Sequence, residues 1–129
     1  MSVPVGRILV VDDDKSMLWV LEEYLRSSLS CAVIGVGSVN EAHHLLREDS
    51  FDLVICDFHM DGETGLDLLQ RLIAEDIRLP FFLYTSSPNI HEDSFSDLDY
   101  IFSVVHKPDV EGLLSRVSEA LGRLTCPTA

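Results

Sequence analysis

Short, almost purely apolar runs alternate along this chain with longer stretches whose apolar residues recur every three or four positions. This alternation limits the possible folds more than any other feature. The short runs cover residues 7–11, 31–36, 51–57, 80–85 and 101–105. Runs of this length, apolar at nearly every position, are typical of strands buried on both faces. The stretches between them are long enough to be crossover helices, so the sequence predicts a parallel sheet.

Helical periodicity predicts helices over about residues 16–28, 38–48, 66–73 and 108–124. The second of these opens on Ser38-Val39-Asn40-Glu41, which has the S-x-x-E pattern of a capping box. Residues 86–99 are rich in Ser and Asp and contain Pro88, so any fourth helix there is expected to be short or loosely held. The prediction is therefore an α/β fold with helices on both faces of a five-stranded parallel sheet.

Length and composition indicate a single domain. A chain of 129 residues with 47% apolar content can bury one core and is too short for two ordinary domains. We expect one domain over residues 1–129, with its core at about 7–124 and a short C-terminal tail.

Charge and cysteine usage exclude several classes of function. Nine Lys and Arg against 22 Asp and Glu leave a formal net charge of −13, which argues against direct nucleic-acid binding. Three cysteines without metal-ligand spacing favour a reducing, cytoplasmic setting. No apolar run approaches the roughly 18 to 20 residues of a membrane span, so no membrane insertion is expected.

Polar side chains follow four of the five predicted strands. Asp12 and Asp13 end the first, Asp57 ends the third, Thr85 ends the fourth and Lys107 follows the fifth. Parallel strands deliver their carboxyl ends to one edge of the sheet, where such folds bind ligands. Carboxylates that converge there repel one another, and the repulsion must be relieved by a cation, by protonation or by solvent.

In these residues the chain resembles the receiver domain of two-component response regulators. The resemblance rests on residues 8–14, on Asp57 with Met60 three and Gly65 eight residues later, on Thr85 after an apolar strand, and on Lys107-Pro108. It covers about residues 7–124, and it implies the flavodoxin-like strand order 2-1-3-4-5.

The resemblance also implies the chemistry. Asp57 would accept a phosphoryl group from a sensor histidine kinase or a histidine phosphotransfer protein. Mg²⁺ would be held by Asp12, Asp13, Asp57 and the backbone carbonyl of His59, a set of oxygen ligands that suits this ion. Such a domain is a signalling module rather than an enzyme, because it catalyses only its own phosphorylation and dephosphorylation.

Lys107 and Thr85 would contact the phosphoryl oxygens, Lys107 as a point charge and Thr85 through its hydroxyl. In receivers this hydroxyl moves on phosphorylation and carries the following loop with it, which changes the surface. Asp14 is expected to cap the first helix instead of entering the site.

Four further positions bear on lifetime and switching. His59 and Ser87 occupy the positions that tune phosphoryl lifetime in receivers. Three residues before the lysine, receivers usually carry Tyr or Phe, whose ring swings inward; here the residue is Val104. Phe102 points to the same side of the strand, so we hypothesise that it, or Tyr100, fills part of that role.

Two other functions remain open. A phosphoaspartate hydrolase of the haloacid dehalogenase type needs a second Asp two residues after the first, where this chain has His59. A receiver-like scaffold that binds partners without phosphorylation is the stronger alternative, motivated by Val104 and the weak fourth helix. From the receiver resemblance, a second copy or an output partner is expected to bind at the fourth helix, the fifth strand and the fifth helix.

Overall fold

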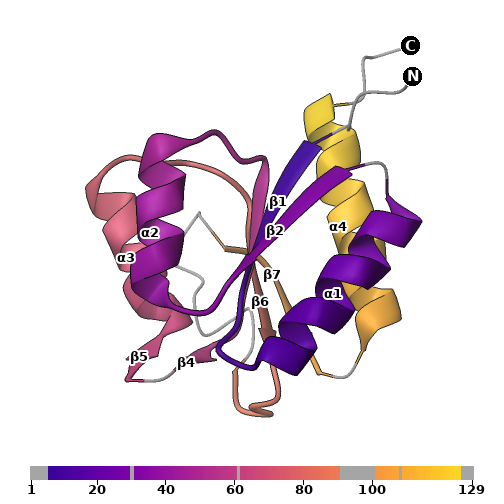
Figure 1. Cartoon of the computed structure of the whole chain (residues 1–129), viewed down its shortest axis with the longest axis horizontal. Coiled ribbons are helices and arrows are strands. Elements are labelled where there is room, and N and C mark those ends of the chain that lie inside the picture. The colour runs from indigo at the N-terminus through magenta and orange to yellow at the C-terminus, as the bar shows by residue number, and fades with distance from the viewer. Residues whose placement is uncertain (1–5, 30, 61, 91–100, 108, 126–129) are drawn as a thin grey trace.

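Five parallel strands form the main sheet of the structure, a computed structural model that describes residues 6–29, 31–60, 62–90, 101–107 and 109–125. The order across the sheet is β2-β1-β3-β6-β7 (Figure 1). The strands are β1 (Gly6–Val11), β2 (Cys31–Val36), β3 (Leu53–Cys56), β6 (Phe81–Thr85) and β7 (Ile101–His106). Since β6 and β7 are its fourth and fifth strands in chain order, the expected order 2-1-3-4-5 is confirmed. The order reverses between β1 and β3, which marks the expected binding edge.

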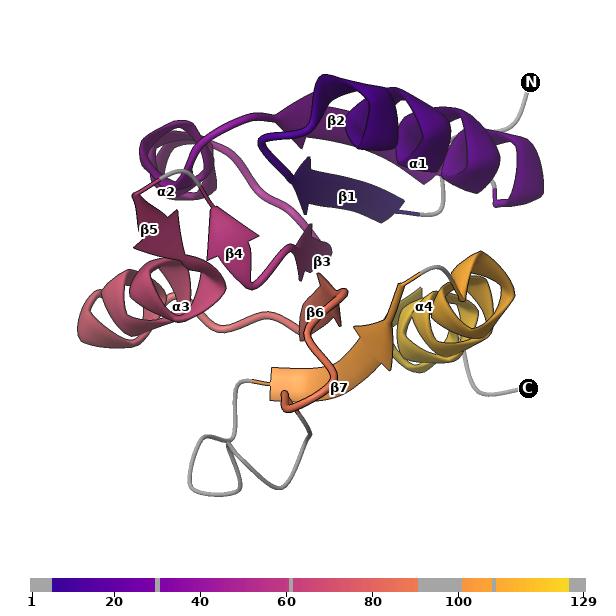
Figure 2. The ribbon, with the colours of Figure 1, turned by 90° about the horizontal axis from the view of Figure 1, so that it is seen from below.

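Helices cover both faces of this sheet. They are α1 (Lys15–Ser28), α2 (Val39–Glu48), α3 (Gly65–Ala74) and α4 (Val110–Thr125). Figure 2 shows α1 and α4 together on one side of the strands and α2 and α3 on the other. The predicted doubly wound α/β architecture is therefore confirmed. Within the described ranges, no helix is long and apolar enough to cross a membrane.

Burial on both faces explains why the strands are apolar at every position. Along β1, Ile8 and Val10 pack into the core under α1 and α4, whereas Leu9 and Val11 pack into the core on the α2 and α3 side. Successive side chains of a strand point to opposite faces, so each face needs its own apolar residues. Cys31 and Cys56 are buried free thiols, as expected of small hydrophobic residues.

Two predicted helix starts are confirmed in detail. The Ser38 hydroxyl accepts a hydrogen bond from the backbone amide of Glu41 at 3.1 Å, which caps α2. The Asp14 carboxylate accepts from the amides of Ser16 at 3.0 Å and Met17 at 3.3 Å, which caps α1. Each side chain satisfies amides that have no partner inside the helix. Asp14 is thereby turned toward α1.

The structure also departs from the sequence prediction. Gly62 and Gly65 indicate a loop after the third strand, but the segment before α3 also contains a small antiparallel pair, β4 (His59–Met60) and β5 (Glu63–Thr64). Strands of two residues are too short to produce a periodic pattern. Thr125 lies at the end of α4 instead of in the tail. The weak fourth helix was placed largely within residues 91–100, which lie outside the described residues.

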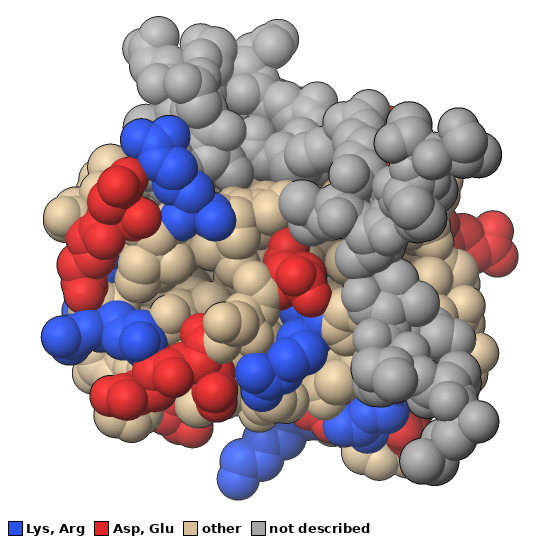
Figure 3. Space-filling view, turned by 90° about the horizontal axis from the view of Figure 1, so that it is seen from above, with Lys and Arg blue, Asp and Glu red and all other residues tan. Residues whose placement is uncertain are grey.

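Acidic and basic side chains are interspersed on the face seen in Figure 3. Pairs of opposite charge among the described residues include Arg78 with Asp76 at 2.9 Å and Arg7 with Asp49 at 3.8 Å. No continuous basic patch is visible among the described residues on that face.

Gly65 lets the start of α3 approach the end of β3. A Cβ atom at this position would lie 2.8 Å from the backbone oxygen of Asp57 and 2.9 Å from a methyl carbon of Leu83. Both distances are shorter than a carbon atom tolerates, and the first involves backbone. A side chain at position 65 must therefore push the end of β3 away from α3.

We expect Gly65→Ala to lower the free energy of unfolding by about 1 to 3 kcal/mol, the usual cost of overpacking a core. Gly37→Ala is the matched control, because its Cβ would come no closer than 3.9 Å to another atom, and it should change stability by less than about 0.5 kcal/mol. Urea denaturation followed by circular dichroism measures both. Equal stability of the two variants would contradict the close contact at Gly65.

Candidate metal centre at the carboxyl edge of the sheet

Three carboxylates converge where β1 and β3 end. One oxygen from each of Asp12, Asp13 and Asp57 lies within 4.8 Å of the other two. Backbone hydrogen bonds position them, because the amide of Asp57 donates to Val11 at 3.0 Å and that of Asp12 donates to Val36 at 3.1 Å. The ladder thus extends beyond the strands, and the meeting of these residues that the sequence predicted is observed.

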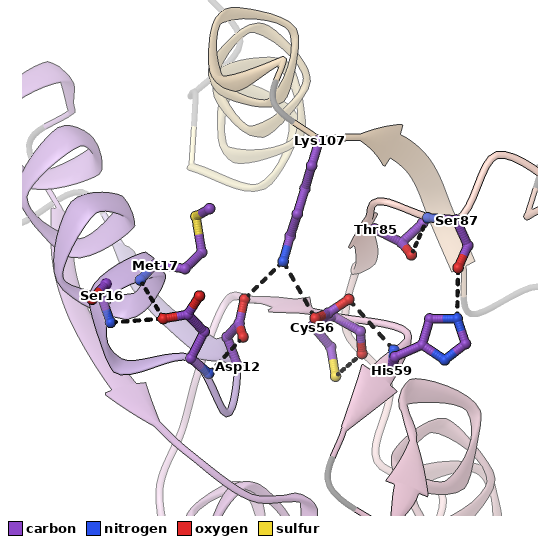
Figure 4. A network of polar contacts seen from close by, with 10 residues as sticks. Asp12, Ser16, Met17, Cys56, His59, Thr85, Ser87 and Lys107 are labelled. Carbon is purple, nitrogen blue, oxygen red and sulfur yellow. Dashed lines mark hydrogen bonds and ion pairs between the residues drawn. The ribbon is translucent and has the colours of Figure 1, made fainter.

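Lys107 lies between two of these carboxylates. Its ammonium is 3.0 Å from Oδ2 of Asp12 and 3.3 Å from Oδ2 of Asp57 (Figure 4). The backbone amide of Lys107 donates to the carbonyl of Thr85 at 2.8 Å, which extends the pairing of β6 with β7 and aims the side chain across the edge. One cation therefore joins the ends of β1, β3 and β7.

Burial and charge shift the protonation equilibria of this cluster. The pKa of Asp57 is raised, mainly by burial and further by the charge of Asp12, and the positive charge of Lys107 only partly offsets this. Burial lowers the pKa of Lys107, but its hydrogen bond to Asp12 and the charges of Asp12 and Asp57 outweigh burial, so the net pKa is raised. The Lys107 side chain therefore stays cationic at neutral pH. The ionised form of Asp57 is less stable in this site than the same carboxylate is in water.

The donor set fits a small, hard divalent cation. Oxygen ligands of one Mg²⁺, each at about 2.0 to 2.1 Å, lie about 2.9 to 4.2 Å apart in an octahedron. The carboxylate oxygens lie within 4.8 Å of one another, which approaches this range. Asp13 is exposed, which leaves room for the water ligands that Mg²⁺ retains. Asp12 is 2% exposed and already accepts from the amide of Asp14 at 2.9 Å.

A second set of contacts joins the loops after β3 and β6. Thr85 is fully buried, and its hydroxyl accepts from the amide of Ser87 at 3.1 Å. The Ser87 hydroxyl is 2.5 Å from Nε2 of His59, and the amide of His59 donates to Asp57 at 3.4 Å (Figure 4). The sequence pointed to each residue separately. The contact between His59 and Ser87 spans 28 positions and has no local pattern that predicts it.

The positions of the proposed aromatic switch lie in β7 and just before it. Val104 is 8% exposed, pairs with Leu83, and packs in the core on the α2 and α3 side. The backbone of Phe102 lies in β7, but its side chain and all of Tyr100 lie outside the described residues. The suggested role of either ring therefore stays a prediction.

Tyr84 also lies against this edge, although the sequence patterns did not single it out. Tyr84 precedes Thr85 in β6, and the centroid of its ring is 5.7 Å from the ammonium of Lys107. The only signal in the sequence was an aromatic residue with a polar tip at the end of a buried strand. Such a residue is ordinarily assigned to the core, and Tyr84 is indeed 1% exposed.

The doubly wound fold and an acidic edge with a facing lysine define a class of α/β signalling domain. The family model described as response regulator receiver domain matches residues 8–117. The chain belongs to the receiver domain family of response regulators, and receivers are signalling domains whose general property is Mg²⁺-dependent phosphotransfer.

Individual relatives agree with this assignment. The virulence sensor protein BvgS of Bordetella pertussis is 34% identical in an alignment of 130 residues, gaps included, that covers 95% of this chain and 10% of that protein. The two-component response regulator ARR14 of Arabidopsis thaliana is 43% identical over 79 residues, which is 60% of this chain and 20% of the plant protein. The chain thus spans about a tenth to a fifth of the length of these curated relatives.

A solved structure resembles the whole fold. It is response regulator protein TrrA from Thermotoga maritima in complex with Mg²⁺ and BeF, which has a TM-score of 0.75 and 26% sequence identity. The match covers 88% of this chain and 97% of that chain. A metal ion therefore occurs in a structure that this chain resembles.

The raised pKa of Asp57 predicts a stability difference that depends on pH. A carboxyl with a higher pKa in the folded state binds more protons there, so stability falls as pH rises from the ordinary value near 3.9 through the folded pKa. In metal-free buffer, Asp57→Asn should therefore have the higher melting temperature at pH 7. The gap should shrink toward zero as both Asp57 and its unfolded counterpart become protonated below about pH 4.

Differential scanning calorimetry in EDTA between pH 3.5 and 7.5 measures this difference. Asp52→Asn is a useful control, because Asp52 accepts from the backbone amide of Arg7 at 2.8 Å and lies apart from the acidic edge. A lower melting temperature for Asp57→Asn at pH 7 would contradict the electrostatic description of the site.

Proposed function

We propose that Asp57 is the phosphoacceptor of this receiver domain and that its donor is the phosphohistidine of a sensor kinase or histidine phosphotransfer protein. The observation that supports this most directly is the convergence of Asp12, Asp13 and Asp57, two of which, Asp12 and Asp57, pair with Lys107. We propose that Mg²⁺ is held by these three residues and by the backbone carbonyl of His59. When bound, Mg²⁺ would neutralise charge on the phosphoryl oxygens.

In this proposal the nucleophile is a carboxylate oxygen of Asp57. It forms a bond to phosphorus while the bond between phosphorus and the donor imidazole nitrogen breaks, and the electron pair of that bond stays on the nitrogen. Lys107 lies 3.3 Å from Asp57, so its ammonium can pair with a phosphoryl oxygen without a large movement. Asp12 keeps the other side of that ammonium paired at 3.0 Å.

The contacts of Thr85 suggest how phosphorylation would change the surface. Its hydroxyl now accepts a hydrogen bond from the amide of Ser87. If the hydroxyl turns to donate to a phosphoryl oxygen, the amide of Ser87 loses this partner, and so the loop after β6 is free to rearrange. Ser87 also contacts His59, so the same movement reaches the loop after β3.

The remaining assignments are also proposals. Residues 7–124 would form one receiver unit that catalyses only its own phosphorylation and dephosphorylation, in the reducing cytoplasm. A second copy or an output partner would bind through β7, α4 and the helix expected within residues 86–99, most of which lie outside the described residues. A phosphorylation-independent scaffold is the alternative, and the observation in its favour is Val104, buried where receivers usually carry the switching ring.

Incubation with acetyl phosphate and Mg²⁺, followed by intact mass spectrometry, tests the proposal. Wild type should gain one phosphoryl group, and Asp57→Asn should gain none. Omission of Mg²⁺ or the substitution Lys107→Ala should slow the reaction at least tenfold, because each removes positive charge that stabilises the transition state by more than about 1.4 kcal/mol. Asp76→Asn, an exposed acidic residue far from the edge, is the control. An unmodified wild type would favour the scaffold.

His59 should control phosphoryl lifetime through its side chain. The imidazole contacts Ser87 beside Asp57, and its removal gives water readier access to the phosphoryl group. We expect His59→Ala to speed dephosphorylation about three- to tenfold, equivalent to about 1 kcal/mol, and to leave Mg²⁺ affinity within about twofold because the proposed ligand is the backbone carbonyl.

Ser87→Ala distinguishes the effect of the hydrogen bond from the effect of the ring's bulk, because it removes the Ser87 hydroxyl and leaves the imidazole of His59 in place. Phosphoryl lifetime is followed by loss of mass after removal of the donor, and Mg²⁺ affinity by calorimetric titration. Weaker Mg²⁺ binding with an unchanged lifetime would assign His59 to the metal site instead.

A further inference from the structure

Tyr84 combines two unusual properties for a core residue. Its side chain is 1% exposed, yet its hydroxyl has no hydrogen-bond partner, and it is the one such buried side-chain atom found among the described residues. A buried hydroxyl without a partner destabilises the fold compared with a phenylalanine of the same shape. Any role of Tyr84 at this edge must therefore come from its ring and not from its hydroxyl.

The ring of Tyr84 faces the cation of the acidic edge. The ammonium of Lys107 lies 5.7 Å from the ring centroid while it also pairs with Asp12 and Asp57. An aromatic face attracts a cation within about 6 Å through the ring quadrupole, and the attraction increases when water is excluded. Here the contact is shielded, because Tyr84 is buried and the Lys107 side chain is only 16% exposed.

We propose that Tyr84 is a positioning residue for Lys107, whose ring holds the ammonium in the place where it meets Asp57 and an incoming phosphoryl group. A lysine side chain is a flexible four-carbon chain with many rotamers. The two carboxylates attract its charged end, and the ring adds a neutral, rigid surface that leaves fewer orientations for that chain. This inference rests on the proposed function, because Lys107 is assigned its role there.

The electrostatics of the phenol agree with this geometry. Burial raises the pKa of Tyr84, the charge of Lys107 lowers it, and the charge of Asp109 raises it again. The phenol is therefore neutral at physiological pH, and it is close enough to Lys107 for the charge of the ammonium to influence it. Because its hydroxyl makes no hydrogen bond, the attraction must act mainly through the ring, and a phenylalanine should replace the tyrosine.

The first experiment needs no phosphorylation. In the metal-free protein, NMR should show the ε-methylene protons of Lys107 shifted upfield by the ring current of Tyr84. Tyr84→Phe should keep this shift and Tyr84→Leu should abolish it, and the spectrum of Lys107→Ala identifies the signal. A shift that survives Tyr84→Leu would overturn the proposal, whether or not Asp57 accepts a phosphoryl group.

The second experiment measures the rate of phosphorylation by acetyl phosphate with Mg²⁺. Tyr84→Leu should react about three- to tenfold more slowly, the factor expected for the loss of a partly desolvated cation–π contact, and Tyr84→Phe should restore the rate to within about twofold of wild type. Phe82→Leu is the matched control. It removes a fully buried aromatic side chain from the same face of β6, two residues farther from the edge, and should leave the rate unchanged.

The outcomes distinguish a positioning role of Tyr84 from damage to core packing and from a failure of the proposed function. Equal losses of rate in Tyr84→Leu and Phe82→Leu would mean that only core packing was damaged, which overturns the positioning role. If wild type itself gains no phosphoryl group, the proposed function fails and the NMR result alone decides the contact. Should Tyr84→Leu fail to fold, Tyr84→Met takes its place, since its unbranched, flexible side chain can adapt to the space left by the ring and it also lacks a ring.

Discussion

The ammonium of Lys107 is the interaction on which the organisation of this edge depends. Asp12, Asp13 and Asp57 present oxygens within 4.8 Å of one another, and such a group of like charges is unfavourable when partly buried. Lys107 offsets part of this cost by pairing with two of the three. In the proposed function, the remaining excess of negative charge would attract a divalent cation. Burial, together with the charge of Asp12, raises the pKa of Asp57. The stability of this edge and its proposed reactivity would therefore have one electrostatic origin.

The fold supplies this arrangement through backbone hydrogen bonds. The amides of Asp12, Asp57 and Lys107 each continue the ladder beyond the last strand residue, so the three side chains start from fixed points at the ends of β1, β3 and β7. Gly65 permits α3 to begin directly against the carbonyl of Asp57. The contact of His59 with Ser87 ties the two loops that flank the phosphoacceptor candidate. Backbone pairing thus positions the edge on the side of the sheet, and a side-chain contact connects the two loops beside it.

Much of this could be anticipated from local patterns. Apolar runs located the five strands, and the polar residues just after them, such as Asp57 and Lys107, identified the edge. Caps at Asp14 and Ser38 were readable because a capping side chain acts within three residues. The β4–β5 pair was missed because two-residue strands lack periodicity, and Tyr84 was missed because one aromatic residue in a buried strand is indistinguishable from ordinary core.

The amino-acid sequence by itself determined the class of fold and the kinds of side chain available at the binding edge, because strand and helix periodicity and strand-end chemistry are local properties of the chain. The tertiary structure alone decided which groups touch: that Lys107 pairs with both Asp12 and Asp57, that His59 meets Ser87, and that the ring of Tyr84 faces the ammonium. These contacts join residues 23 to 95 positions apart. Their distances follow from strand register and crossover packing, which no local pattern encodes.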